Sequence, residues 1–310
     1  MTLNELRYII AVSQQLNFRR AAEQVFVSQP ALSLAIQKLE EELGVQIFER
    51  SRTGVSITAM GELIVAQAQL VLEETARIKV IASQGRNQLR GALKIGAIYT
   101  VGPYLLPALI PILKRRAPEM PLDVEENLTA NLQELLLRGQ LDVIVIALPF
   151  AVPGIAIRPL YDEDFDVLVP ADHIWAKKKN IHASELASEK MLMLNSGHCF
   201  SNQIAEACPE LNRRGAEPAH GNSLETIRNM VASGLGITVL PASANSAKYR
   251  SPLTRAIPFS VPAPSRRIAL AWRKSFVREE AIDVLGEAII EAKVDGTQPI
   301  SERDSTVEVA

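Results

Sequence analysis

The stretch that decides the fold of the N-terminal region runs from residue 18 to residue 50 and reads FRRAAEQVFVSQPALSLAIQKLEEELGVQIFER. It contains a short helical pattern with two adjacent alanines, a turn at Val27, and a longer helical pattern. Ser28 is a typical N-cap residue for the second helix, and Pro30 fits its first turn. Apolar side chains recur on one face of this helix, at Leu32, Ile36, Leu39 and Leu43. The pattern predicts a helix-turn-helix whose second helix packs that face on the core.

The solvent side of the second helix carries residues suited to DNA recognition. Near its start lie Gln29, Pro30, Ala31, Ser33, Gln37 and Lys38. This part of a helix-turn-helix meets base edges in the major groove, whereas arginines suit the phosphates. The candidate phosphate contacts are Arg19, Arg20, Arg50 and Arg52. Several glutamates in the same region leave an ordinary helical bundle with a solvated polar face as the alternative.

This region resembles the winged helix-turn-helix of LysR-type transcriptional regulators. The resemblance rests on Phe18 with the Ala21-Ala22 pair, on the run from Val27 to Ser33, and on Ile36-x-x-Leu39-Glu40-x-x-Leu43-Gly44 followed by Phe48-x-Arg50. It implies a domain over residues 1–58 that binds double-stranded DNA, in which Gly44 to Thr58 form the wing.

Residues 59–90 contain no proline and predict one long helix. Its repeating positions are Ile64, Ala68, Val71, Thr75, Ile78 and Ala82. These spacings of four and three are typical of a coiled-coil seam between two subunits, and a helix packed on its own chain is the alternative. The family resemblance implies a linker helix that dimerises, so that two recognition helices read an inverted repeat.

The composition limits the remaining classes of function. A chain of 310 residues with 47% hydrophobic residues can form two or three globular domains. Its formal net charge is −2, so DNA binding has to rest on local surfaces. The N-terminus lacks a signal-peptide pattern and no apolar run of 18 residues occurs, which predicts a cytoplasmic protein without a membrane segment. Neither a cofactor nor a bound metal is expected.

From residue 91 the pattern changes to short apolar strands that alternate with helices. The strand candidates lie at 93–98, 122–124, 141–146, 191–194, 236–240 and 268–272. This alternation predicts α/β architecture, in which ligands bind where strands end, and Thr100 and Thr129 follow the first two strands. Three prolines spaced four apart predict that the first helix begins near Pro107 or is distorted.

The family resemblance implies that residues 91–295 form a regulatory domain with two lobes of the periplasmic-binding-protein type and a cleft between them. Lobe I then comprises about residues 91–162 and 268–295, and lobe II about residues 163–267. The chain is expected to cross between the lobes near Asp162–Asp164 and Arg267–Ile268. The polar residues 296–310 predict a disordered tail.

The chain has two cysteines, Cys199 and Cys208. A helix capped by Ser201 would separate their Cα atoms by about 13 Å, on opposite faces, so a disulfide could form only if the helix unwound. A thiol just before a helix N-terminus ionises readily, and His198 can add charge or a hydrogen bond. The pair is a candidate redox switch, while two small buried side chains or a zinc site are the alternatives.

Within the family, the resemblance narrows to regulators that sense hydrogen peroxide. It extends to about residue 290 and includes Thr100 to Pro107, Gly197 to Cys199, Cys208 and Ser223 to Ala232. It implies that Cys199 is the peroxidatic cysteine and Cys208 the resolving cysteine. The implied peroxide pocket contains Thr100, Thr129, His198 and Arg266, with Arg267 as the alternative arginine.

The same resemblance implies a homodimer or homotetramer that recruits RNA polymerase and is reduced by glutaredoxin or thioredoxin. Two other functions stay open. The protein could be a regulator that binds a small carboxylate or amino acid between its lobes, with the cysteines incidental. It could also be an enzyme, a thiol peroxidase joined to a helical domain.

Overall fold

The computed structural model describes residues 1–51, 54–82, 88–209, 219–300 and 308–309. The chain divides into two compact units, each of which has its own core. The N-terminal unit contains Met1–Asn87 together with the short segments Leu137–Gly139 and Ser275–Val277, and the rest of the chain forms the regulatory unit. Among the described residues, no helix is long and apolar enough to cross a membrane.

The N-terminal unit is built from helices and one hairpin. Its elements are α1 (Leu3–Gln15), α2 (Phe18–Gln24), α3 (Gln29–Leu43), β1 (Phe48–Ser51), β2 (Gly54–Ile57) and α4 (Ala59–Ala82). The Ser28 side chain caps α3 by accepting from the Ala31 amide at 3.4 Å, and Gly44 ends α3 in the left-handed conformation at φ +70°. The predicted helix-turn-helix with a β-hairpin wing is therefore confirmed.

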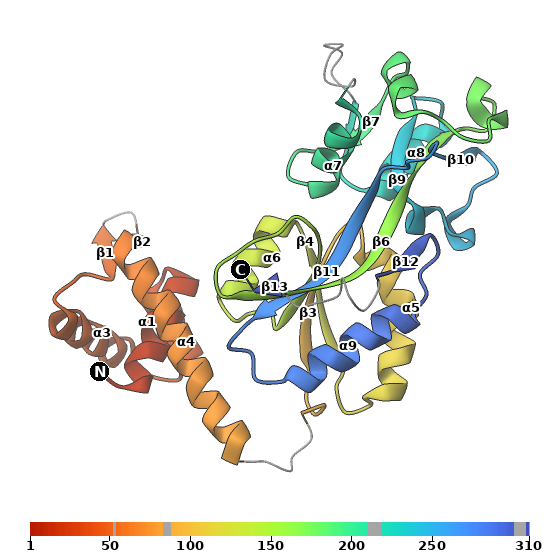
Figure 1. Ribbon diagram of the computed structural model, residues 1–310. Coiled ribbons are helices and arrows are strands. Elements are labelled where there is room, and N and C mark those ends of the chain that lie inside the picture. The colour runs from red at the N-terminus through yellow and green to blue at the C-terminus, as the bar shows by residue number, and fades with distance from the viewer. Residues whose placement is uncertain (52–53, 83–87, 210–218, 301–307, 310) are drawn as a thin grey trace. The chain divides into compact units, whose positions relative to one another are not determined.

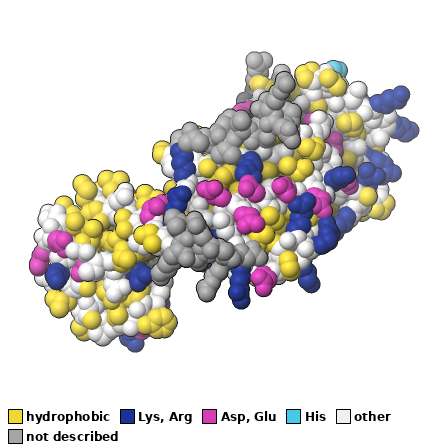
Figure 2. Space-filling view, turned by 60° about the horizontal axis from the view of Figure 1, so that its bottom comes forward, with side chains coloured by type: hydrophobic (Ala, Val, Ile, Leu, Met, Phe, Trp, Pro, Cys, Tyr) yellow, Lys and Arg dark blue, Asp and Glu magenta, His cyan; other side chains and the backbone are white. Residues whose placement is uncertain are grey.

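The inner face of α4 differs from the predicted coiled-coil seam. Ala68 is buried in the core of its own unit, and Ile64 and Val71 pack against that core, which favours the alternative of a helix packed on its own chain at these three positions. A spacing of four and three describes a core-facing stripe as well as a seam between subunits. The large apolar side chains of α4 that are exposed are Met60, Leu63, Leu70 and Ile78, of which Ile78 is a predicted seam position. Figure 2 shows hydrophobic side chains spread over much of one face of this unit.

The regulatory unit contains a sheet in the order β10-β6-β11-β5-β3-β4, with β9, β12 and β13 also paired to β6. The elements around its first half are β3 (Leu93–Ile98), α5 (Gly102–Arg116), β4 (Leu122–Asn127), α6 (Thr129–Leu137), β5 (Val143–Ala147) and α9 (Glu279–Glu291). Strand β3 pairs with β4 and β5 in parallel, so the ends of β3 and β4 meet at one edge. Figure 1 shows α5 and α9 next to each other against this part of the sheet, where they are in contact.

The second half of the regulatory unit is built around the other end of β6. Its elements are 3-10 helices η1 (Ile174–Lys177) and η2 (Ala183–Ser188), β7 (Leu192–Leu194), α7 (Cys199–Ala207), β8 (Ala219–Gly221), α8 (Leu224–Ala232), β9 (Thr238–Pro241), 3-10 helices η4 (Ala242–Asn245) and η5 (Ala247–Tyr249), and β10 (Thr254–Pro258). Their apolar side chains form one core, which includes Phe200, Ile204 and Cys208.

Two long strands, β6 (Ile155–Pro170) and β11 (Ser265–Arg273), connect the halves of the regulatory unit (Figure 1). Residues Ile155–Asp164 of β6 pair with β11, and Phe165–Pro170 pair with β9 and β10. We call the half around β3, β4 and β5 lobe I, and the half around α7, β9 and β10 lobe II. The architecture is the α/β class that the sequence predicts.

Helix α5 begins at Gly102, five residues before the position predicted for it. Pro103 lies in the first turn, where its missing N–H costs no helical bond. Pro107 lies inside the helix and leaves the Pro103 carbonyl without its usual partner. The Tyr249 hydroxyl donates to this carbonyl at 2.9 Å, which explains how lobe II helps the helix continue past proline.

The end of the chain differs from the predicted disordered tail. Thr297–Pro299 form β12, which pairs antiparallel with Tyr161–Glu163 of β6, and Glu308–Val309 form β13 on the same strand. A backbone that adds to an open sheet edge gains hydrogen bonds regardless of its polar side chains, so composition alone misses it. Residues 301–307 and 310 lie outside the described residues.

Candidate functional site

Three turns of the regulatory unit meet at the edge where β3 and β4 end. The turn after β3 contributes Thr100, the turn after β4 contributes Leu128, and the loop before α7 contributes His198. The rings of Tyr99 and His198 lie 5.9 Å apart, and a Cβ built on Gly197 would lie 3.2 Å from Cδ1 of Leu128. Gly197 has φ +103°, which favours glycine. The loop before Cys199 therefore approaches lobe I closely.

Arg266 is the buried charge at this edge. Its guanidinium donates to the Thr100 hydroxyl at 2.8 Å and to the Thr100 carbonyl at 2.9 Å. It also forms a buried ion pair with Glu163, with nitrogen–oxygen distances of 2.8 and 2.7 Å. Glu163 accepts in turn from the Ser243 amide at 3.0 Å. The position and orientation of the guanidinium are therefore fixed from both sides.

Arg267 takes no part in this arrangement. It pairs with Asp162 at 2.8 and 2.9 Å, and both side chains are about two-fifths exposed. Successive residues of a strand point to opposite faces of a sheet, so only one of the two arginines can point inward. Of the two candidates in the sequence, Arg266 is the inward one.

Arg266 also lies next to the helix that carries Cys199. Its guanidinium carbon lies 5.1 Å from the ring centre of Phe200, the residue after Cys199, and this ring packs edge-on against Phe165 at 5.0 Å. Phe200 is completely buried. A cation against an aromatic face is a favourable contact, so Phe200 ties the start of α7 to the arginine.

Helix α7 begins at Cys199, and its N-cap lies three residues before the predicted cap, Ser201. His198 takes the N-cap position, and the Ser201 hydroxyl donates to the Leu194 carbonyl at 3.0 Å rather than capping the helix. Cys199 is therefore the first helical residue, is half-buried, and lies among backbone N–H groups that have no partner within the helix. These groups and the helix dipole can stabilise negative charge that develops at this position during a reaction.

Burial lowers the pKa of His198 below its usual value. The imidazole is therefore mostly neutral at neutral pH. Of the two roles considered for His198, the structure favours a hydrogen bond over a positive charge beside Cys199.

Cys208 lies at the other end of α7. It is 1% exposed, belongs to the core of lobe II, and has the non-helical φ of −131° that a residue before Pro209 prefers. Nine residues of helix separate the two thiols by about 13 Å along the axis. Both cysteines are thiols in this structure. A disulfide between them requires α7 to unwind.

Three buried side-chain oxygens in this part of lobe I and on α7 have no hydrogen-bond partner among the described residues: Thr129 Oγ1, Glu126 Oε1 and Gln203 Oε1. Such atoms are costly unless a water or ligand satisfies them. Gln203 also donates from Nε2 to the Leu148 carbonyl at 3.2 Å, which joins α7 to lobe I. Burial raises the pKa of Glu126.

Sequence reasoning missed Glu163, Gln203 and Glu126. Glu163 lies in an acidic run, Asp162-Glu163-Asp164, that reads as a solvated crossing segment. An acidic residue at a position where the strand passes from one lobe to the other was the available signal. No local pattern marks Gln203 or Glu126.

The candidate DNA contacts lie on the surface of the N-terminal unit. Gln29, Pro30, Ala31, Gln37 and Lys38 of α3 are exposed and Ser33 is half-buried. Arg19 and Arg20 of α2 are also exposed, and Arg19 donates to Glu23 at 3.3 Å. The Arg50 side chain and all of Arg52 lie outside the described residues. The eight described side chains are free of the core and available to a partner.

Two family models match the chain. Residues 3–62 match the bacterial regulatory helix-turn-helix protein of the lysR family, and residues 86–293 match the LysR substrate binding domain. The first covers the whole helix-turn-helix with its wing, and the second covers both lobes.

Individual relatives agree over nearly the whole chain. The chain is 40% identical over 296 residues to the DNA-binding transcriptional dual regulator OxyR of Escherichia coli K12, which covers 96% of this chain and 97% of the relative. It is 38% identical over 273 residues to the hydrogen peroxide-inducible genes activator of Haemophilus influenzae, which covers 88% of this chain and 91% of the relative.

Solved structures give the same result. A full-length OxyR variant from Pseudomonas aeruginosa has a TM-score of 0.86 at 50% identity, covering 97% of this chain and 99% of that chain. The reduced form of OxyR from Neisseria meningitidis has a TM-score of 0.65 at 43% identity, covering 68% of this chain and all of that chain. The protein therefore belongs to the LysR family of transcriptional regulators, and its similarity within that family is to OxyR.

Proposed function

We propose that this protein is a cytoplasmic transcriptional regulator that binds DNA and senses hydrogen peroxide through Cys199 and Cys208. The observation that carries the proposal is the placement of the two thiols at opposite ends of α7, with Cys199 as the first helical residue and the next residue, Phe200, against the buried Arg266. The relatives named as hydrogen peroxide-inducible genes activators support the same function. No cofactor is needed for this chemistry.

In the first step, the Cys199 thiolate attacks one oxygen of hydrogen peroxide and the O–O bond breaks. The sulfur becomes a sulfenic acid, and the other oxygen leaves as hydroxide and takes a proton to become water. The Thr100 hydroxyl accepts from Arg266 and so keeps its own hydrogen for the peroxide. Thr129 Oγ1, which has no partner among the described residues, and neutral His198 complete the proposed pocket.

In the second step, the Cys208 sulfur attacks the sulfenic sulfur and displaces its oxygen as water, which forms the disulfide. Cys208 has to leave the core of lobe II and α7 has to unwind. Unwinding also removes the Gln203 contact with the Leu148 carbonyl of lobe I. A change at one redox helix thereby alters the packing between the lobes. A dithiol reductant such as glutaredoxin or thioredoxin would restore both thiols.

The proposed partners are an inverted-repeat operator in double-stranded DNA, further copies of this chain in a dimer or tetramer, and RNA polymerase. The disulfide would change the surface through which subunits pack, and with it the spacing of the recognition helices on DNA.

The test of this function is the mass of the intact reduced protein, with a count of free thiols, before and after brief exposure to stoichiometric peroxide. We expect a loss of two hydrogens that maps to Cys199 and Cys208. Two unreacted thiols would contradict the proposal and favour a regulator of a small ligand. Repeated turnover of peroxide with a thioredoxin-type reductant, at a rate useful for detoxification, would favour a thiol peroxidase.

Loss of a base contact from α3 and loss of a phosphate contact from α2 should change DNA affinity in different ways. We expect Gln29→Ala to lose about 1–3 kcal/mol of discrimination between operator and unrelated DNA, because a base contact is lost. We expect Arg20→Ala to weaken both DNAs alike and to lower the slope of log affinity against log salt by about one. Titration of both variants with operator and scrambled duplexes, over a range of salt concentrations, measures the discrimination between the two DNAs and the salt slope. Equal loss on both duplexes for Gln29→Ala would contradict base readout.

The exposed apolar residues of α4 predict its role in self-association. Leu63 and Leu70 are 66% and 41% exposed and lie two turns apart on one side of the helix. We expect Leu70→Glu to shift the protein toward monomer in sedimentation experiments, since a carboxylate would be buried between subunits. Ala76→Glu, about 120° around the same helix from Leu70, is the control and should leave the mass unchanged. A wild-type mass for Leu70→Glu would show that this face does not join subunits.

A further inference from the structure

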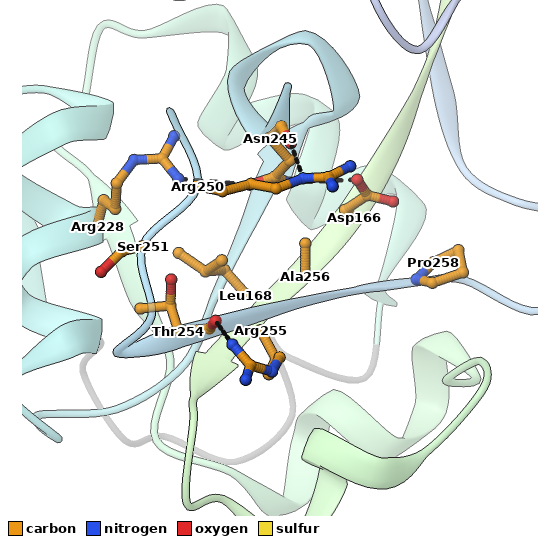
Figure 3. Close-up of a pocket in the computed structure, with 10 residues that line it drawn as sticks. All are labelled: Asp166, Leu168, Arg228, Asn245, Arg250, Ser251, Thr254, Arg255, Ala256 and Pro258. Carbon is orange, nitrogen blue, oxygen red and sulfur yellow. Dashed lines mark hydrogen bonds between the residues drawn. The ribbon is translucent and has the colours of Figure 1, made fainter. Parts of the chain in front are cut away.

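We propose a second binding site in lobe II, a pocket for a small oxyanion such as a carboxylate or a phosphate. The pocket has a volume of about 480 Å³. Its lining residues come from β6, α8, η4, β10 and the loop before β10: Asp166, Leu168, Arg228, Asn245, Arg250, Ser251, Thr254, Arg255, Ala256 and Pro258 (Figure 3). None of them belongs to the cysteine site, so the two sites can be tested separately.

The charges around this pocket favour an anion. Three arginines and the carboxylate of Asp166 line it, and Arg228 is also paired with Glu225 at 3.1 Å. The Arg255 side chain points away from Arg228 and Arg250 (Figure 3). Arg250 is exposed and has no ion-pair partner among the described residues, so its charge beside the pocket creates a positive potential that an anion can neutralise.

Arg228 supplies a preorganised donor. It is 6% exposed, and its guanidinium is held by Glu225 at 3.1 Å and by the Ala244 carbonyl. Its Nη1 makes a single long bond, 3.5 Å to the Asn245 side chain. Four of its five N–H groups are used within the protein, so one N–H of Nη1 stays available, and a guanidinium whose position is already fixed loses little entropy when it donates this bond to an oxyanion.

Two hydroxyls on the Arg228 side of the pocket are ready to donate, whereas the Arg250 guanidinium lies at the Asp166 end (Figure 3). Thr254 is 5% exposed and lines the pocket, so its hydroxyl can meet a bound anion. Ser251 Oγ accepts from the Leu253 amide at 3.2 Å and keeps its own hydrogen. Figure 3 shows Thr254 and Ser251 at the Arg228 side of the pocket. This end therefore offers several donors for the oxygens of one anion.

The rest of the pocket agrees with an anion that carries a short carbon chain. The Leu168 side chain and Ala256 lie between the two ends (Figure 3). Asp166 lies at the end away from Arg228, accepts from the Asn245 side chain at 3.2 Å, and has a pKa raised by burial. Repulsion from Asp166 is thus smallest where the donors gather.

The test is calorimetric titration of the full-length reduced protein with inorganic phosphate and, separately, with succinate, at about 0.15 M ionic strength to screen diffuse attraction. We expect saturable binding of at least one probe at one site per chain. Arg250→Gln and Thr254→Val should each weaken it at least tenfold. Lys248→Gln removes a nearby charge that does not line the pocket and should leave the affinity unchanged.

The two probes distinguish the source of the oxyanion. Tighter binding of phosphate assigns a phosphorylated ligand, and tighter binding of succinate assigns an organic acid. Absence of saturable binding for both probes would overturn the site. An equal loss of affinity in Lys248→Gln and Arg250→Gln would also overturn it, because it would indicate diffuse attraction only. Thermal unfolding of each variant checks that the fold is retained. Because Arg250 is exposed, Arg250→Gln still tests the site if Thr254→Val is unstable.

Discussion

Cys199→Ser is expected to abolish the response to peroxide completely. The serine hydroxyl does not ionise near neutral pH and cannot reduce peroxide, so neither sulfenic acid nor disulfide forms. After stoichiometric peroxide, the intact mass of this variant should equal that of the untreated protein. Its footprint on operator DNA should stay that of the reduced protein at every peroxide concentration at which the wild-type footprint changes.

Cys208→Ser is the matched control, because it removes the other thiol and keeps Cys199. We expect this variant to gain one oxygen, to be labelled by a dimedone-type probe, and to form no disulfide within the chain. The wild type should show the label only transiently. A footprint that still responds to peroxide in Cys199→Ser would refute the mechanism, and an unlabelled Cys208→Ser protein would show that Cys208 does not resolve a sulfenic acid at Cys199.

The N-terminal fold could be predicted because its signals are local. The Ser28 cap, the period of apolar residues in α3 and Gly44 at its end all act within a few residues, and the structure contains each of them. Which partner covers the apolar face of α4 could not be predicted in the same way. Its apolar residues follow one spacing, but whether Ala68 meets its own core or a second subunit depends on how far α1 covers it.

The candidate site could be predicted only in part, for the same reason. Cys199 stands out by its rarity and its place before a helical pattern. Glu163 and Arg266 are 103 residues apart, and only the pairing of β6 with β11 brings them together. The predicted cap of α7 lies three residues after the observed cap, because Ser201 bonds back to Leu194, a contact that a helix-capping rule does not include.

Glu163 is expected to be the residue whose loss costs the regulatory unit most. Glu163→Ala leaves the Arg266 guanidinium buried without its counterion, and breaking a buried pair in this way costs about 3–5 kcal/mol. The free energy of unfolding can be measured in urea through the fluorescence of Trp175 and Trp272, the two tryptophans of the chain, both of which lie in the regulatory unit. Asp162→Asn is the matched control, because it breaks the exposed neighbouring pair with Arg267 and should cost at most about 1 kcal/mol.

The variant Glu163→Gln distinguishes the role of Glu163 in orienting Arg266 from its role in the stability of the regulatory unit. The amide oxygen can still accept from Arg266, although the Ser243 amide loses its acceptor, so this variant should destabilise the fold less than Glu163→Ala while the charge that orients the guanidinium is gone. We expect oxidation of Cys199 by peroxide to slow by about ten- to a hundredfold, since small shifts of an orienting group have effects of this size. The alkylation rate of Cys199 against pH gives the independent readout, because Arg266 packs against Phe200, the residue next to Cys199. A folded Glu163→Gln protein with wild-type oxidation and alkylation profiles would mean that Glu163 acts on stability alone and that Arg266 needs no carboxylate to serve the peroxide pocket.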